Sequence, residues 1–294
     1  MYAELCLRIG AEDQALSIAE HHVSIASAHD HGSAVHARAQ ETMATCLASV
    51  GRLEEAEQAS RAAVDLWTAL ADAGDDDPDV PGGLAHAWNT LANRLLGLDR
   101  PEEAASAAAR AAALWPADSI GRGSALYLVG VALAQLDRHR QAAASFRESV
   151  AVYQEHTPLA PHQETQLSDI LHNLACSYIR LGEHSEAFAC ASHAAAILHR
   201  QWQADPVAHY AHLLRALETL MHCGAQADEL PTAAEAARLR VTVLETHPGT
   251  EPLQLGMALA IWADSSWSSV LRRTPSSPSP AAPRPSPRIQ AHAP

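Results

Sequence analysis

Apolar and polar positions along the chain repeat one pattern: an apolar helix, a short polar turn, and a second helix punctuated by alanine. Apolar residues three and four apart place one face of each helix against its neighbours. Glycine or aspartate at each turn can adopt the left-handed conformation that ends a helix. The pattern predicts six helix-turn-helix pairs whose turn residues are Gly10, Gly51, Asp99, Asp137, Gly182 and Gly224.

The second helix of each pair carries an alanine at a fixed place, five residues after the turn residue. Alanine is the strongest helix former, and its small side chain allows two helices to approach closely. In the sixth pair Glu229 occupies this place and Pro231 follows. We therefore expect the second helix of that pair to begin late, near Thr232, and to pack differently. The alanines of the first five pairs are Ala15, Ala56, Ala104, Ala142 and Ala187.

The third pair resembles the tetratricopeptide repeat most fully. Its first helix matches the W-x2-L-G-x2-Y half of the family signature, with Ala for Gly and Leu for Tyr. Its second helix matches the A-x3-F…P half, with Ala for Phe. The matching residues are Trp88, Leu91, Ala92, Leu95, Ala104, Ala108, Ala111 and Pro116.

The second, fourth and fifth pairs carry similar spacings, so the resemblance covers roughly residues 1–248. Its copies are about 42 residues long, which exceeds the family's usual length of about 34. They are similar to the longer repeats of kinesin-light-chain-like and bacterial signalling proteins. The resemblance implies an all-α fold, a right-handed α-solenoid of about six helix-turn-helix repeats.

The two ends of the chain differ in composition. Met1 enters partway through a first helix, so we expect the opening repeat to lack its first turn. Leu253–Leu271 predicts one further helix that caps the array. The segment beyond it is rich in Pro, Ser and Arg, a composition typical of disorder. The predicted organisation is a solenoid over 1–271 and a tail over 272–294. The tail is a proline-rich ligand, a solvated segment without a role, or an out-of-frame extension.

Composition narrows the possible functions. Apolar residues make up 48% of the chain but aromatic residues only 4%, which favours many close-packed alanine-rich helices over one round core. All 20 basic residues are Arg, which excludes Schiff-base lysine enzymes and the lysine of a phosphate-binding P-loop. The formal net charge of −14 repels phosphate backbones, so we expect no nucleic acid partner.

The apolar segments and the cysteines indicate the cellular compartment of the protein. No stretch of 18 apolar residues is present, so no membrane span is expected. Met1–Gly10 lacks the basic and long apolar regions of a signal peptide. The five cysteines are widely spaced and lie in apolar helical segments, a pattern that favours reduced thiols in the cytoplasm.

No group of residues predicts catalysis or metal binding. His29 and His31 lie in a His-rich segment without the four spaced ligands of a zinc site. The acidic run at 75–79 lacks the glutamate of a calcium loop, and neither G-x-S-x-G nor G-x-G-x-x-G occurs. We therefore expect a protein that is not an enzyme and that uses no cofactor and no metal.

The tetratricopeptide resemblance implies where a partner would bind. In the family, the first helix of each repeat lines a concave groove with residues between its packing positions. The three asparagines of the chain, Asn89, Asn93 and Asn173, all lie in first helices. Asparagine is a poor helix former, so each one either pairs with a bound peptide backbone or satisfies a neighbouring helix. The implied groove residues are Arg38, Glu41, Thr45, His86, Asn89, Asn93, Ser124, Tyr127, Val131, Asp169, His172, Cys176, Arg180, Leu214, Glu218 and His222.

The leading functional hypothesis is a non-enzymatic scaffold that binds a protein or peptide in this groove. Some family members clamp a partner's C-terminal carboxylate with Lys, Asn and Arg, and in a chain without Lys this clamp is incomplete. The alternative hypothesis is the sensor or regulatory segment of a larger bacterial regulator or signalling ATPase. The effector domain of such a protein would lie outside this chain.

Overall fold

The chain folds into helices joined by short turns. The computed structural model describes residues 2–29, 32–74, 77–247 and 252–273, and no strand occurs among them. Most of the tail predicted at 272–294 therefore lies outside the described residues. The helices are α1 (Tyr2–Arg8), α2 (Glu12–His29), α3 (Ala34–Ser49), α4 (Leu53–Asp72), α5 (Val80–Gly97), α6 (Pro101–Leu114), α7 (Ile120–Gln135), α8 (His139–Glu155), α9 (Pro161–Leu181), α10 (His184–Ala204), α11 (Pro206–Gln226), α12 (Leu230–Thr246) and α13 (Pro252–Arg273).

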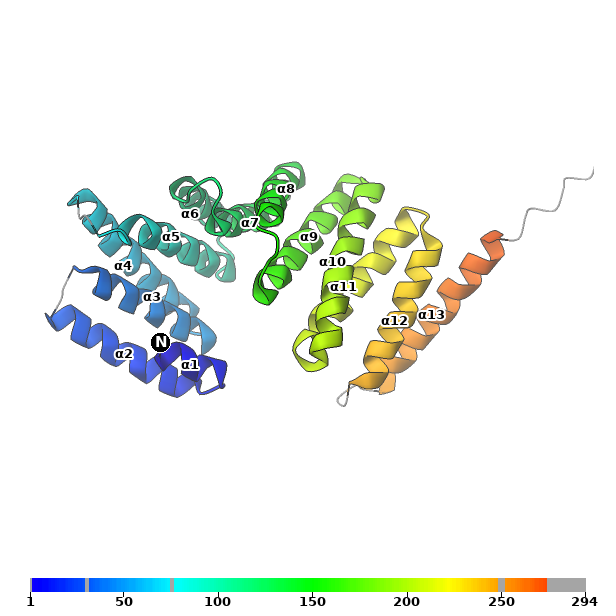
Figure 1. The fold of residues 1–294 in the computed structure, drawn as a ribbon, viewed down its shortest axis with the longest axis horizontal. Helices are drawn as coiled ribbons and strands as arrows, with labels where there is room; N and C mark the ends of the chain where they lie inside the picture. Colours follow the sequence, from blue (N-terminus) through cyan, green and yellow to red (C-terminus); the bar gives the residue numbers. More distant parts are fainter. Residues whose placement is uncertain (1, 30–31, 75–76, 248–251, 274–294) are drawn as a thin grey trace, which may run out of the picture.

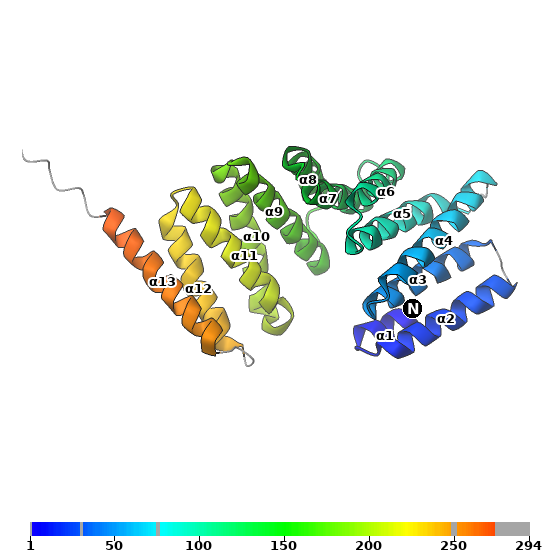
Figure 2. The same cartoon turned by 180° about the vertical axis from the view of Figure 1, so that it is seen from behind.

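The helices pack in chain order as six pairs, from α1 with α2 to α11 with α12, and α13 follows as a single helix (Figure 1). The backbone of each odd-numbered helix from α1 to α9 also approaches that of the next odd-numbered helix, whereas within the described segments no two even-numbered helices have such a backbone contact. The odd helices therefore form the inner layer of a curved array and the even helices its outer layer. The array places α1 and α13 at opposite ends (Figures 1 and 2). This arrangement confirms the predicted α-solenoid of about six repeats.

The turns within the six pairs share one hydrogen-bonded geometry. Each contains a residue with positive φ, and the next residue donates its N–H to the carbonyl five positions earlier, as Arg52 does to Leu47 at 2.9 Å. This Schellman arrangement satisfies carbonyls that the end of a helix leaves without partners. The six turn residues are Gly10, Gly51, Asp99, Asp137, Gly182 and Asp228.

The sixth turn shows that the prediction for this repeat was wrong. Its positive-φ residue is Asp228 and not Gly224, and α12 begins at Leu230 rather than near Thr232. Pro231 fits the first turn of α12 because backbone N–H groups there have no partner within the helix. Ala233 is then the fifth residue after the turn and is buried like its counterparts. The sixth pair therefore follows the same pattern as the other five.

Small residues set the distance between the two layers. The predicted alanines Ala15, Ala56, Ala104, Ala142 and Ala187 are fully buried. Between α7 and α8, a Cβ added at Gly130 would lie only 2.4 Å from the ring of Phe146. Because Phe146 is itself fully buried, its ring has little room to move, and the close contact requires glycine.

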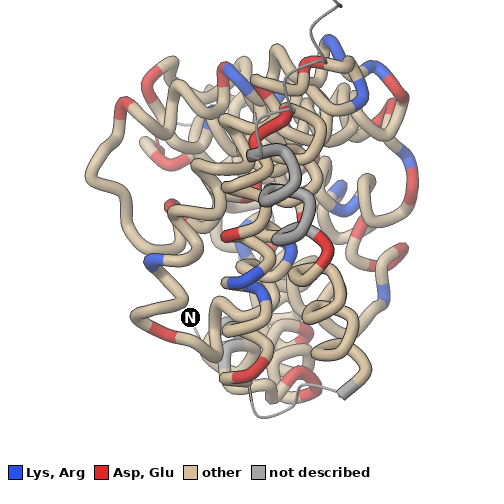
Figure 3. Tube along the Cα trace, turned by 90° about the vertical axis from the view of Figure 1, so that its right-hand side faces the viewer, with Lys and Arg blue, Asp and Glu red and all other residues tan. Residues whose placement is uncertain are grey.

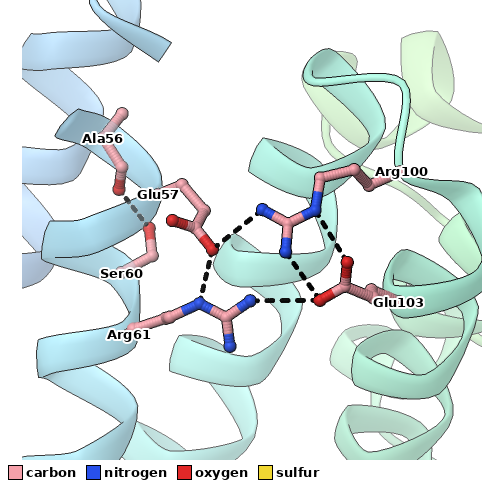
Figure 4. A network of polar contacts seen from close by, with 6 residues as sticks. All are labelled: Ala56, Glu57, Ser60, Arg61, Arg100 and Glu103. Carbon is pink, nitrogen blue, oxygen red and sulfur yellow. Dashed lines mark hydrogen bonds and ion pairs between the residues drawn. The ribbon is translucent and has the colours of Figure 1, made fainter. Parts of the chain in front are cut away.

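Some arginines of the outer layer form ion pairs with carboxylates of the same chain. Acidic and basic residues lie interspersed over the outline of the array (Figure 3). Between α4 and the start of α6, the nearly buried carboxylate of Glu57 accepts hydrogen bonds from Arg61 and, at 3.3 Å, from Arg100 (Figure 4). Glu103 accepts from Arg100 at 2.7 Å and from Arg61 at 3.2 Å. These two arginines and two glutamates form a closed network, called here the outer network, that joins the second and third repeats.

Candidate binding site on the inner layer

Most of the predicted groove residues occupy three repeated positions of the inner layer, 13, 10 and 6 residues before each turn residue. Because the sixth turn lies at Asp228, the first of these positions holds Arg215 instead of the predicted Leu214. Glu218 and His222 keep their places. Most of the side chains at these positions lie in two hollows and one hydrogen-bonded group.

The first hollow, of about 620 Å³, lies beside α3 and α5. Within it the indole N–H of Trp67 donates to the carboxylate of Glu41 at 3.1 Å, and Arg38 forms an ion pair with Asp79. Burial raises the pKa of Glu41 above its usual range. The predicted residues that line this hollow are Arg38, Glu41, Thr45 and His86.

The second hollow, of about 230 Å³, lies between α5, α7 and α9. The buried Tyr153 of α8 also lines it, and its hydroxyl donates to Gln166 at 3.0 Å. Burial raises the pKa of Tyr153 to about 12, so this hydroxyl stays protonated at neutral pH. The predicted residues that line the second hollow are Asn89, Asn93, Ser124, Tyr127 and Asp169.

The three asparagines of the inner layer have different surroundings. Asn173 satisfies its neighbours, because its amide donates to the Asp169 carbonyl at 2.9 Å and to the Tyr127 hydroxyl at 3.4 Å. Asn89 donates to Ser124 at 3.4 Å, but its Oδ1 is buried without a hydrogen-bond partner among the described residues. Asn93 is exposed at the second hollow. Asn89 and Asn93 therefore retain hydrogen-bonding capacity.

A polar group between α9 and α11 surrounds His172. Its Nδ1 lies 3.1 Å from the Thr219 hydroxyl, and its Nε2 lies 3.8 Å from the Cys176 thiol. Asp169 and Arg215 form an ion pair beside it. Burial, followed by the positive charge of Arg215, lowers the pKa of His172 below its usual value. His172 is therefore neutral at neutral pH and acts as a hydrogen-bonding side chain.

The remaining predicted residues lie away from the two hollows. Arg180 pairs with Asp137 at 3.6 Å and donates to His139 at 3.3 Å, next to the turn between α7 and α8. Val131 is half-buried and packs against the core. Glu218 and His222 are exposed on α11.

Trp67 and Arg94 are among the residues that line the hollows and that the sequence interpretation missed. Trp67 comes from the second helix of its repeat, and Arg94 lies five residues before its turn residue, off the three repeated positions. For Trp67 the available signal was a large aromatic side chain in an alanine-rich helix. For Arg94 the sequence carried no signal, because an arginine on an amphipathic helix is usually solvated.

The described residues contain no group of three or more His, Cys, Asp or Glu that could hold a metal ion. Within the same residues, no helix combines the length and apolar character needed to cross a lipid bilayer. All five cysteines are free thiols. Burial raises the pKa of Cys190 and of Cys223 to about 11, which disfavours their reactive thiolate form.

Comparison with known proteins identifies the repeat. Residues 168–197, which span the turn between α9 and α10, match the family model described as tetratricopeptide repeat. No curated protein sequence matches the chain.

Three solved structures share the fold at low identity. BtubC (BKLC) from P. vanneervenii is 16% identical with a TM-score of 0.62, over 96% of this chain and 99% of that one. A putative kinesin light chain from P. anserina, with nearly identical TPR-like repeats, is 16% identical to this chain with a TM-score of 0.54, over 70% of this chain and 93% of that one. PilF from Pseudomonas aeruginosa is 17% identical with a TM-score of 0.53, over 88% and 94%.

The family match lies in the fifth repeat, whose turn geometry and buried alanine recur in the other five. The similar structures extend the same fold over nearly the whole chain. The chain therefore contains a tetratricopeptide repeat at residues 168–197 and has the fold of solved structures built from tetratricopeptide-like repeats.

Proposed function

We propose that the chain is a non-enzymatic scaffold whose inner layer binds an extended segment of a partner protein. Tetratricopeptide repeat proteins typically mediate protein binding and are usually not catalytic, and this chain shares their fold. The proposed partner is a protein or peptide in the cytoplasm, and neither a nucleic acid nor a membrane.

A buried acceptor on the inner layer carries the proposal. Asn89 Oδ1 has no hydrogen-bond partner in the described part of the chain, although buried polar atoms normally have one. Asn93 lies one helical turn further along α5, and both side chains line the second hollow. Carboxamides both donate and accept, so the pair suits the alternating N–H and C=O groups of an extended peptide.

The two hollows favour an extended ligand over a small one. Helix α5 contributes His86 to the first hollow and Asn89 to the second, so a peptide that crosses α5 would contact both. The first hollow is lined by charged groups and the second mainly by uncharged polar ones. A partner segment would therefore meet two chemically different surfaces, which is a basis for sequence preference.

Selection from a display library of random short peptides tests the proposal. Peptides enriched on the wild-type chain are synthesised, and their dissociation constants are measured by calorimetry. We expect the double change Asn89→Ala and Asn93→Ala to weaken binding by about 1–3 kcal/mol, counting about 0.5–1.5 kcal/mol for each lost hydrogen bond. Circular dichroism of the double variant should remain that of the wild type.

The matched control is Ser106→Ala, because Ser106 is an exposed polar residue on the outer helix α6. This variant should bind the selected peptides as the wild type does. Equal affinity of the wild type and the asparagine double variant for every selected peptide would move binding away from the second hollow and overturn the proposal.

A further inference from the structure

We propose that the second hollow holds an acidic side chain of the bound peptide against the guanidinium group of Arg94. The inference rests on the proposed function and specifies its partner: a peptide that presents one Asp or Glu to the inner face of α5.

Arg94 is a charged group without a counterion in the part of the chain that the structure describes. Its side chain lines the second hollow and is half-buried, and its Nε is fully buried with no hydrogen-bond acceptor. No carboxylate of a described residue forms an ion pair with Arg94. Asp169 lines the same hollow but is paired with Arg215. The positive charge of Arg94 therefore faces the hollow uncompensated.

Burial of an unpaired charge is unfavourable, and the effect is visible at this residue. Burial lowers the pKa of Arg94, and no acidic neighbour opposes that shift. A carboxylate that enters the hollow would supply the missing negative charge. It would also accept charge-assisted hydrogen bonds, which are about twice as strong as neutral ones, and a guanidinium can donate two of them in parallel.

The rest of the hollow suits a carboxylate that belongs to a peptide. The Tyr127 hydroxyl accepts from Asn173, which leaves its own proton to donate. Burial and the nearby Asp169 raise the pKa of Tyr127, so that proton is retained. Asn89 Oδ1 needs a donor, which a backbone N–H beside the acidic residue can provide. The hollow thus offers donors for an anion and an acceptor for an amide.

The place of the hollow in the array favours an internal side chain over a terminal carboxylate. The inner layer continues on both sides, with the first hollow towards α3 and the His172 group towards α11. A peptide seated at Arg94 can therefore extend in both directions. Because the chain carries a net charge of −14, a highly acidic segment would be repelled, and we expect one acidic residue flanked by neutral or basic ones.

The library selection described above also tests this inference, because peptides fused to the display protein at their C-termini present only side-chain carboxylates. On the wild-type chain we expect enriched peptides to share one position occupied by Asp or Glu, and on Arg94→Gln we expect that preference to vanish. In a synthetic selected peptide, replacing the acid by its amide should weaken binding to the wild type roughly 10- to 100-fold. The same replacement should change binding to Arg94→Gln by less than about twofold, within the spread of exposed charge pairs.

Two further variants separate charge from structure. Arg110→Gln removes an exposed arginine that stacks on Trp88 at 4.7 Å, away from the second hollow, and should leave the acid preference intact. Arg94→Lys retains the charge and should retain part of the preference. Circular dichroism and melting of each variant confirm that the solenoid is folded.

Selected peptides without an acidic position, or an acid preference that survives in Arg94→Gln, would overturn the inference and leave the proposed function standing. If no enriched peptide depends on Asn89 and Asn93, both the proposed function and this inference fail. Sodium glutarate is the third probe, followed through the nitrogen-15 resonance of Arg94 Nε. If it binds as tightly as a selected peptide, the hollow is a site for a small free carboxylate and the assignment to a peptide is wrong.

Discussion

Arg94 and Arg100 lie in neighbouring parts of the third repeat, yet their guanidinium groups have opposite surroundings. In the outer network Arg100 meets two carboxylates, with Glu103 at 2.7 Å and the nearly buried Glu57 at 3.3 Å. In the second hollow Arg94 meets none. The outer network also closes on Arg61, so its charges neutralise one another across two repeats (Figure 4).

The difference separates residues that hold the solenoid together from residues that remain available to a ligand. A closed network satisfies its own hydrogen bonds and connects adjacent helices, so its removal should lower stability. An uncompensated charge beside a hollow lowers stability and can be neutralised by a bound group. The following predictions test this division, beginning with the largest expected effect.

Gly130→Ala should disturb the packing of α7 against α8, beside the second hollow. The new Cβ would lie 2.4 Å from the buried Phe146 ring, so α7 or Phe146 must shift, at a typical cost of about 1–3 kcal/mol. Chemical denaturation measures the change. The matched control is Gly97→Ala, where nothing lies within 4 Å of the added Cβ and stability should stay equal or rise by up to about 1 kcal/mol. Equal stability of the two variants would contradict the helix contact described here.

Glu57→Ala should open the outer network. The substitution removes one of the carboxylates that pair with Arg61 and Arg100, and both arginines are partly exposed. We therefore expect the unfolding free energy to fall by about 1–2 kcal/mol, which is less than the cost of breaking a fully buried ion pair. Urea denaturation compares this variant with Glu102→Ala, an exposed neighbour that should be close to neutral. A Glu57 variant as stable as the wild type would show that the network does not hold these repeats together.

Arg94→Met should raise the stability of the chain, whereas Gly130→Ala and Glu57→Ala should lower it. The change removes an uncompensated charge but keeps a flexible apolar side chain, so we expect stability to rise by roughly 0.5–1 kcal/mol. The same variant should lose the preference for acidic peptides. A lower melting temperature for Arg94→Met would mean that Arg94 is compensated within the chain and would remove the contrast with Arg100.

The smallest effect concerns pH. Because the pKa of His172 is lowered in the folded chain, the folded state favours the neutral imidazole. The contribution of neutral His172 to the unfolding free energy is fully present above the ordinary histidine pKa of about 6.5. This contribution is lost as the pH falls below that value. The unfolding free energy should therefore drop less on acidification for His172→Gln than for the wild type. His162→Gln changes an exposed histidine of the same helix and serves as the control substitution. Equal dependence of stability on pH for His172→Gln and the wild type would refute the assigned role of burial.

The helix pairs could be predicted because their signals are local. Residues such as Asp99 and Gly182 end a helix through their own backbone preferences, and the alanine five residues later marks the helix crossing. The same reasoning went wrong in the sixth repeat, because Gly224 and Asp228 both suit a turn. Only packing chose between them: with Asp228 as the turn, Ala233 reaches the buried crossing, and a Cβ on Gly224 would lie 3.1 Å from that of Ala233.

The repeated positions of the inner layer, among them Asn89, Tyr127 and Asp169, could also be expected from the family resemblance. Whether they bind a partner remains a prediction. The sequence by itself determined the helix pairs and five of the six turns, because each depends on residues within a few helical turns. Only the tertiary structure decided that Trp67 joins the first hollow and that no carboxylate of a described residue pairs with Arg94. The surroundings of a charge are set by helices distant in the sequence, and no local pattern specifies which carboxylates they bring near.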